Sequence, residues 1–150
     1  METPAPLPPS PIISTQFLCR GNLDAARFCE AFHDFCHTLD DLLDRDNPEG
    51  IQRDRVVRVM LTAVLEFSMN AFFQANRAGL LSLISQSFIA WGDSMDWQDS
   101  GDARKIRDAD VIKGLYHEVF FHVALLCGGY DHARAVTRAT REYDHEPGTE

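Results

Sequence analysis

The sequence lacks several patterns, and each absence narrows the class of protein. No stretch alternates polar and apolar residues for long enough to predict a β-strand. No apolar run reaches the about 18 residues of a transmembrane helix, and no signal peptide is recognisable, so we expect no membrane span. The four cysteines contain no CxxC pair. A reduced, cytoplasmic setting is therefore the simplest expectation.

Positive charge is also scarce. Lysine and arginine number 14 against 23 acidic residues, for a formal net charge of −9. Nucleic acids and anionic membranes repel such a chain, so general binding to either is not expected. Cations and basic proteins remain as ligands. One basic stripe (Arg134, Arg138 and Arg141) offers a contact for an acidic partner or a second subunit, which leaves a homo-oligomer open.

The hydrophobic periodicity predicts an all-α chain, arranged as a single-domain bundle of four long helices and a short C-terminal helix. The expected helices span about 22–46, 51–75, 77 or 79–91, 103–127 and 130–143. The second is apolar nearly all round, which is typical of a central, buried helix. Five prolines within residues 1–12 indicate a flexible or extended arm. The domain boundaries are thus an arm at 1–14, a bundle at 15–145 and a polar tail at 146–150.

The segment from His33 to Asp46 carries two histidines and five acids on the first expected helix. Asp40 and Asp44 lie about one turn apart, with Asp41 at the edge of their face. Two carboxylates at this spacing can share a hard cation such as Mg²⁺, and the metal can in turn hold a phosphate. The same stripe also fits the solvated face of an amphipathic helix.

The run Asp40-Asp41-Leu42-Leu43-Asp44 resembles the first aspartate-rich motif of class I isoprenoid synthases. Those enzymes are all-α and bind diphosphate through Mg²⁺, so the resemblance implies Mg²⁺ as cofactor and Asp40, Asp41 and Asp44 as its ligands. It covers this motif alone, since no clear second aspartate-rich motif is present.

A broader pattern resembles small uncharacterised helical proteins encoded by bacteriophages. It comprises an HxxDDxxD helix at 37–44, the run 70–77, the run 91–94 and the Gly128-Gly129 pair. This resemblance implies a host cytoplasmic location and no established activity. It also implies one cluster of polar residues: His37, Asp40, Asp41, Asp44, Asn70 and Asp93.

Glu66 and Asn70 form a polar pair, four residues apart, within the apolar second helix. One functional interpretation is that the pair faces the aspartates as a metal ligand or a general base. A buried hydrogen-bond network that fixes helix register fits the same pair. For phosphate, Arg77 and Lys113 are the candidate cations, although ordinary surface charge is the preferred explanation for each one taken alone.

Glu118 and His122, together with His33 and His37, supply the residue types of a di-metal carboxylate bundle. The Glu-x-x-His signature of such bundles is missing. The histidines at 117 and 122 are five apart, which does not match the HExxH zinc motif. A di-metal bundle is therefore a weaker alternative.

Two functions from different classes follow. The first is a Mg²⁺-type aspartate site that binds a phosphorylated small molecule, with its hydrolysis or transfer as an open extension. It would use Asp40, Asp41 and Asp44, with His37, Glu66, Asn70 and Asp93 as second contributors. The second is a non-enzymatic interaction module, such as a phage inhibitor of a host protein or an assembly factor, with its acidic face against a basic partner. The sequence leaves open whether the chain is an enzyme.

Overall fold

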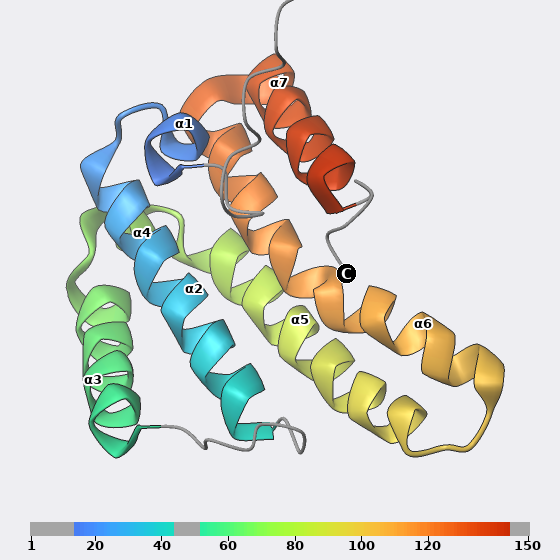
Figure 1. Ribbon diagram of the computed structural model, residues 1–150. Helices are drawn as coiled ribbons and strands as arrows, with labels where there is room; N and C mark the ends of the chain where they lie inside the picture. Colours follow the sequence, from blue (N-terminus) through green and yellow to red (C-terminus); the bar gives the residue numbers. More distant parts are fainter. Residues whose placement is uncertain (1–13, 44–51, 145–150) are drawn as a thin grey trace, which may run out of the picture.

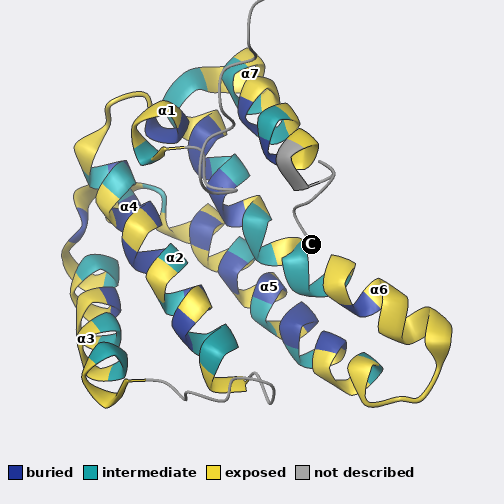
Figure 2. Cartoon of the chain, viewed as in Figure 1, coloured by how far each residue is buried: buried dark blue, intermediate teal, exposed yellow. Residues whose placement is uncertain are grey.

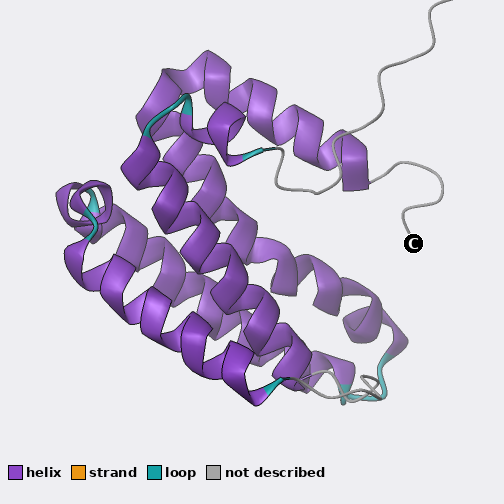
Figure 3. Cartoon of the chain, turned by 60° about the vertical axis from the view of Figure 1, so that its left-hand side comes forward, coloured by secondary structure: helices purple, strands orange, loops and turns teal. Residues whose placement is uncertain are grey.

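The computed structural model describes residues 14–43 and 52–144, and every regular element in them is a helix (Figure 3). The all-α prediction is confirmed. The elements are α1 (Thr15–Cys19), α2 (Leu23–Leu43), α3 (Arg53–Met69), α4 (Ala71–Ala75), α5 (Arg77–Gln98), α6 (Ala103–Lys113), the 3₁₀ turn η1 (Gly114–Tyr116) and α7 (His117–Asp144). The expected arm, except for residue 14, lies outside the described residues, as do Asp44 and the tail at 146–150.

Short polar side chains set several helix starts, as their capping chemistry dictates. The Asn22 side chain accepts a hydrogen bond from the Ala25 backbone N–H at 3.0 Å, which confirms the expected start of α2. Asp102 accepts from the Arg104 N–H at 2.8 Å and begins α6. Each contact satisfies backbone N–H groups that have no partner within the helix.

The expected helix starts at 77 and 103 are also present, whereas other boundaries differ from the expected ones. The second expected helix is interrupted at Asn70, whose extended backbone separates α3 from α4. The third continues to Gln98. The expected helix at 103–127 is divided into α6, η1 and the first part of α7. The expected break before the helix at 130–143 is present as a bend of α7 at Gly129, where φ is 80° and ψ is −173°. This conformation is nearly restricted to glycine, because a Cβ atom would strain it.

One core joins α1, α2, α4, α5 and α7. Phe28 and Phe32 from α2 pack against Phe73 and Phe120, while Leu80 and Trp91 close the core from α5. Figure 2 shows the buried residues as stripes on the faces where these helices meet. The core therefore depends on aromatic contacts between helices that are distant in sequence.

The second expected helix is not central, and that prediction was wrong. The structure places α3 at the edge of the molecule, beside α2 (Figure 1), and Ala63 is its only buried residue. The apolar composition of a helix determines how much surface favours burial, but not how many neighbours are available to cover it. A large part of its apolar surface therefore faces solvent.

The stretch from α6 to α7 satisfies one test for a membrane span. Residues 103–142 contain an 18-residue window of mean hydropathy 1.2, of which 22% is buried. This test depends on length and composition alone, and core helices of soluble proteins also pass it. The absence of a membrane span therefore stays a prediction.

Candidate functional site

The face of α2 that carries His33, His37 and Asp40 lies toward the junction of α6, η1 and α7. Asp40 Oδ1 forms an ion pair with Lys113 Nζ at the end of α6. The same ammonium group lies 5.6 Å from the centre of the Trp91 ring, in a cation–π arrangement. Lys113, which the sequence analysis assigned to phosphate, therefore neutralises Asp40, which the sequence analysis assigned to the metal.

Asp41 points to the other side of α2. Arg55 Nη1 in α3 donates to Asp41 Oδ2 at 2.7 Å. The two adjacent carboxylates thus bind cations from different helices, because successive residues of a helix lie about 100° apart. In the described ranges, no group of three or more His, Cys, Asp or Glu side chains could hold a metal ion. Mg²⁺ binding stays a prediction, with Asp44 outside the described residues.

Glu66 and Asn70 lie at the opposite end of α2 from Asp40. Glu66 Oε1 accepts from Arg27 Nη2 at 2.9 Å, and Arg27 stands thirteen residues, or about 20 Å of helix, before Asp40. The hydrogen bond from Asn70 and the contacts with Arg27 hold the pKa of Glu66 below its usual range. The structure does not bring this pair together with the aspartates.

Asn70 instead connects three backbone or side-chain groups. Its Nδ2 donates to the Asp24 carbonyl at 2.8 Å and to Glu66 Oε2 at 2.9 Å. Its Oδ1 accepts from the Phe73 N–H at 2.9 Å, which caps α4. Of the two roles weighed for this residue, these contacts match the buried network that fixes helix register.

The other second contributors are dispersed. Asp93 is exposed and lies two residues after the buried Trp91, so it points away from the face that meets Lys113. Arg77 is the exposed first residue of α5, about 20 Å of helix from Trp91. Neither residue joins the Asp40 region.

Three histidines come together beside Asp40. The His33 and His37 rings lie 4.2 Å apart on α2, and His117 at the start of α7 acts on His33 electrostatically. Burial, then the neighbouring His37, lowers the pKa of the half-buried His33, while Asp34 opposes the shift. The sequence did not indicate His117 as a member, because its approach depends on the tertiary packing of α7.

We expect this arrangement to weaken the fold in acid. In the unfolded chain His33 binds a proton near pH 6.5, whereas in the folded chain it does so only at lower pH. Stability is therefore complete above about pH 6.5 and falls as the pH decreases through the folded pKa. Urea unfolding at pH 7.5 and 5.5 checks this: His33→Gln should lose less stability than the wild type. An equal loss in both proteins would contradict it.

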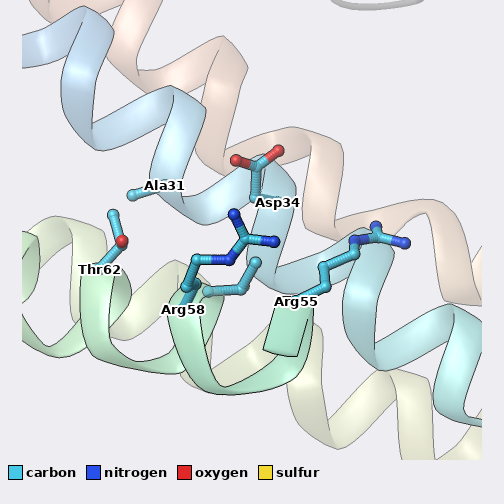
Figure 4. A pocket seen from close by; sticks show the side chains of 6 residues that line it. Ala31, Asp34, Arg55, Arg58 and Thr62 are labelled. Atoms are coloured by element: carbon cyan, nitrogen blue, oxygen red, sulfur yellow. The ribbon is translucent and has the colours of Figure 1, made fainter. Parts of the chain in front are cut away.

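A charged groove runs between α2 and α3, with a volume of about 210 Å³. Figure 4 shows the Asp34 carboxylate and the Arg58 guanidinium facing each other across it. Arg55 extends from its edge to Asp41. Ion pairs therefore join α2 and α3 at residues 27 and 41 of α2, and Asp34 and Arg58 line the groove between these two levels. These charged contacts connect α3 to α2 along much of their shared length.

Glu118 and His122 line a different groove, of about 280 Å³, between α5 and the two halves of α7. Its floor contains Leu83, Phe121 and Leu125. His117, rather than His122, is the histidine of α7 that acts on His33. Glu118 and His122 therefore lie at a different place from His33 and His37, so the side chains of the di-metal alternative do not form one site.

The outward face of α3 carries an apolar stripe that the sequence analysis did not expect. The α3 outer stripe consists of five residues: Val57 (68% exposed), Leu61 (58%), Val64 (61%), Leu65 (47%) and Met69 (77%). Their spacing follows one side of a helix. The exposed stripe became recognisable only once α3 was located at the edge of the fold.

Comparison of the chain with known protein families, with curated proteins and with solved structures gives no match. Its function is therefore inferred from its own residues and their arrangement.

Proposed function

We propose that the chain is a protein-interaction module that binds an amphipathic helix of a partner protein along the α3 outer stripe. The observation that carries this proposal is the exposure of five large apolar side chains on one helix face. Monomeric soluble proteins rarely expose contiguous apolar patches beyond a few hundred Å². Covering such a patch removes apolar surface from water and favours association.

The geometry of the stripe suits a helical partner. From Val57 to Met69 it extends about 18 Å along the axis, with side chains at positions i, i+4, i+7, i+8 and i+12. Ridges at this spacing pack into the grooves of a second helix. The charged contacts between α2 and α3 hold the opposite side of α3 in place, so the stripe is presented on a supported helix.

The charges select the partner. A second copy of the chain would also carry a net charge of −9, and the two copies would repel each other. Arg53 is exposed at the N-terminal end of α3, four residues before the first residue of the stripe. The partner helix would therefore present acidic side chains at that end and an apolar ridge over the rest.

Interaction through α3 replaces the acidic face as the contact surface. The phage inhibitor of a host protein or assembly factor expected from the sequence as the non-enzymatic alternative is one form of this function. The alternative with Mg²⁺ and a phosphorylated ligand is less favoured, because the metal would have to compete with Lys113 for Asp40 and with Arg55 for Asp41.

We expect Leu61→Asp to weaken binding of a helical partner by at least about tenfold, because it places a charge in the centre of the stripe. The probe is a fluorescent amphipathic peptide with leucines at three- and four-residue spacing and glutamates at one end, followed by anisotropy. Val111→Asp is the matched control, because Val111 is 73% exposed but lies on α6. Both positions are exposed, so both variants should remain folded.

Three results would contradict the proposal. The first is that the wild type does not bind the peptide. The second is that Leu61→Asp and Val111→Asp weaken peptide binding equally. The third is that Leu61→Asp does not weaken it. Sedimentation provides a further test of the partner. A wild-type dimer that dissociates on Leu61→Asp would assign the stripe to a second copy and overturn the proposed occupant.

A further inference from the structure

Three cysteines that are distant in sequence meet where α1, α2 and α7 converge. Cys19 ends α1, Cys29 lies in α2 and Cys127 in α7, and all three are free thiols. The Sγ atoms of Cys19 and Cys29 are 3.9 Å apart, and both side chains are buried. Cys127 is partly exposed and acts on Cys19 from the α7 side. The cluster thus has two adjacent buried thiols, Cys19 and Cys29, and a third thiol, Cys127, that is nearer to solvent.

The pKa values of the three thiols are shifted in different directions. The hydrogen bond between Cys19 and Cys29, then the one between Cys19 and Cys127, lowers the pKa of Cys19 against the opposing effect of burial. The pKa of Cys29 is raised, and burial raises the pKa of Cys127 to about 11. The lowered pKa favours the thiolate form of Cys19, and thiolates are the reactive form of cysteine. Its reactivity would arise from the two neighbouring sulfur atoms.

We propose that Cys19 and Cys29 form a reversible redox site that takes a small peroxide as oxidant and closes to a disulfide. This inference is independent of the proposed binding function. The two Sγ atoms must approach by about 2 Å to reach the S–S bond length of about 2.05 Å. Cys19 is the last residue of a five-residue helix, so a small movement of α1 brings the atoms together.

The chemistry proceeds in two balanced steps. The Cys19 thiolate attacks one oxygen of hydrogen peroxide and the O–O bond breaks. Sulfur supplies two electrons and becomes a sulfenic acid, while the departing hydroxide takes up the proton that Cys19 released. Cys29 Sγ then attacks Cys19 Sγ, the S–O bond breaks, and the hydroxyl group leaves as water with the Cys29 proton. Overall, two thiols and one peroxide give one disulfide and two waters, and a small thiol reverses the change.

Cys36 provides a matched control within the same helix. It is buried on α2 like Cys29, and its pKa is raised to about 12 by burial alone. No other sulfur affects it. It therefore reports how a buried thiol of this chain responds to peroxide without a neighbouring sulfur.

The test is peroxide treatment of the folded chain, followed by intact mass measurement and peptide mapping. We expect a loss of two hydrogens, a peptide that links Cys19 to Cys29, and recovery of the original mass with dithiothreitol. Cys36→Ser should not change this result. Cys29→Ser should prevent this linkage. It should leave either a sulfenic acid at Cys19, which dimedone traps, or a Cys19–Cys127 linkage. Cys29→Ala is the second variant, for use if serine unfolds the core.

Several outcomes would overturn the inference. The wild type is decisive without any variant: an unchanged mass, oxidation confined to Cys36 or Cys127, or a linkage that excludes the Cys19–Cys29 pair would each reject it. Circular dichroism before and after treatment establishes that the mapped linkage belongs to the folded chain.

Discussion

Phe28→Ala is expected to lower the free energy of unfolding by about 3–5 kcal/mol, because it empties the centre of the core. The Phe28 ring is fully buried and lies 5.2 Å from Phe73, 5.8 Å from Phe67 and 6.0 Å from Phe32, centroid to centroid. These contacts connect α2 to both α3 and α4. Since single domains have total stabilities of about 5–15 kcal/mol, this variant should be close to unfolding at ordinary temperature.

Urea unfolding followed by circular dichroism measures this effect. Val111→Ala is a suitable control, because Val111 is 73% exposed and its replacement should change stability by less than about 0.5 kcal/mol. If Phe28→Ala cost no more than Val111→Ala, the aromatic contacts would not be the centre of the fold.

Asn70→Ala is expected to cost about 2–4 kcal/mol, although it removes a polar residue. Asn70 is 5% exposed, and its amide satisfies the Asp24 carbonyl, Glu66 and the N-terminal Phe73 N–H of α4. Loss of a helix cap costs about 1 kcal/mol, and each buried group left without a partner costs about 1–3 kcal/mol. Thermal or urea unfolding of the variant measures the sum.

Asn70→Asp separates the two roles of this side chain. It keeps an oxygen for the Phe73 N–H but loses the N–H donors and puts a second carboxylate beside Glu66. We expect it to be unstable at neutral pH and to recover partly in acid, when one carboxyl group takes up a proton. A stability equal to that of the wild type at pH 7 would show that Asn70 acts only as a cap.

The sequence predicted the helical class and most helix positions, because these depend on local properties. Periodic apolar residues and the Asn22 cap indicated α2 within a few residues of its observed bounds. It did not predict the break at Asn70, whose neighbours on both sides are good helix residues. The break is stabilised by the Asp24 carbonyl, which is distant in sequence and reaches Asn70 only through folding.

The candidate site was predicted less well than the fold. Helical spacing placed Asp40 and Asp44 on one face of the first expected helix with Asp41 at its edge, but it contained no information about the helices that these side chains would meet. Lys113 and Arg55 reach Asp40 and Asp41 from α6 and α3, and the resulting ion pairs give the motif a different chemical setting. A motif on one helix specifies its own side chains, whereas its partners are selected by packing.

By itself, therefore, the sequence determined the all-helical class, the net charge, the start of α2 at Asn22, and the amount of apolar surface on each helix. Interactions between residues a few positions apart are sufficient to specify these properties. The tertiary structure alone decided that α3 lies at the edge with an exposed stripe and that Cys19 meets Cys29 and Cys127. These outcomes depend on which helices become neighbours, and that is determined by the combined burial and pairing of the whole chain.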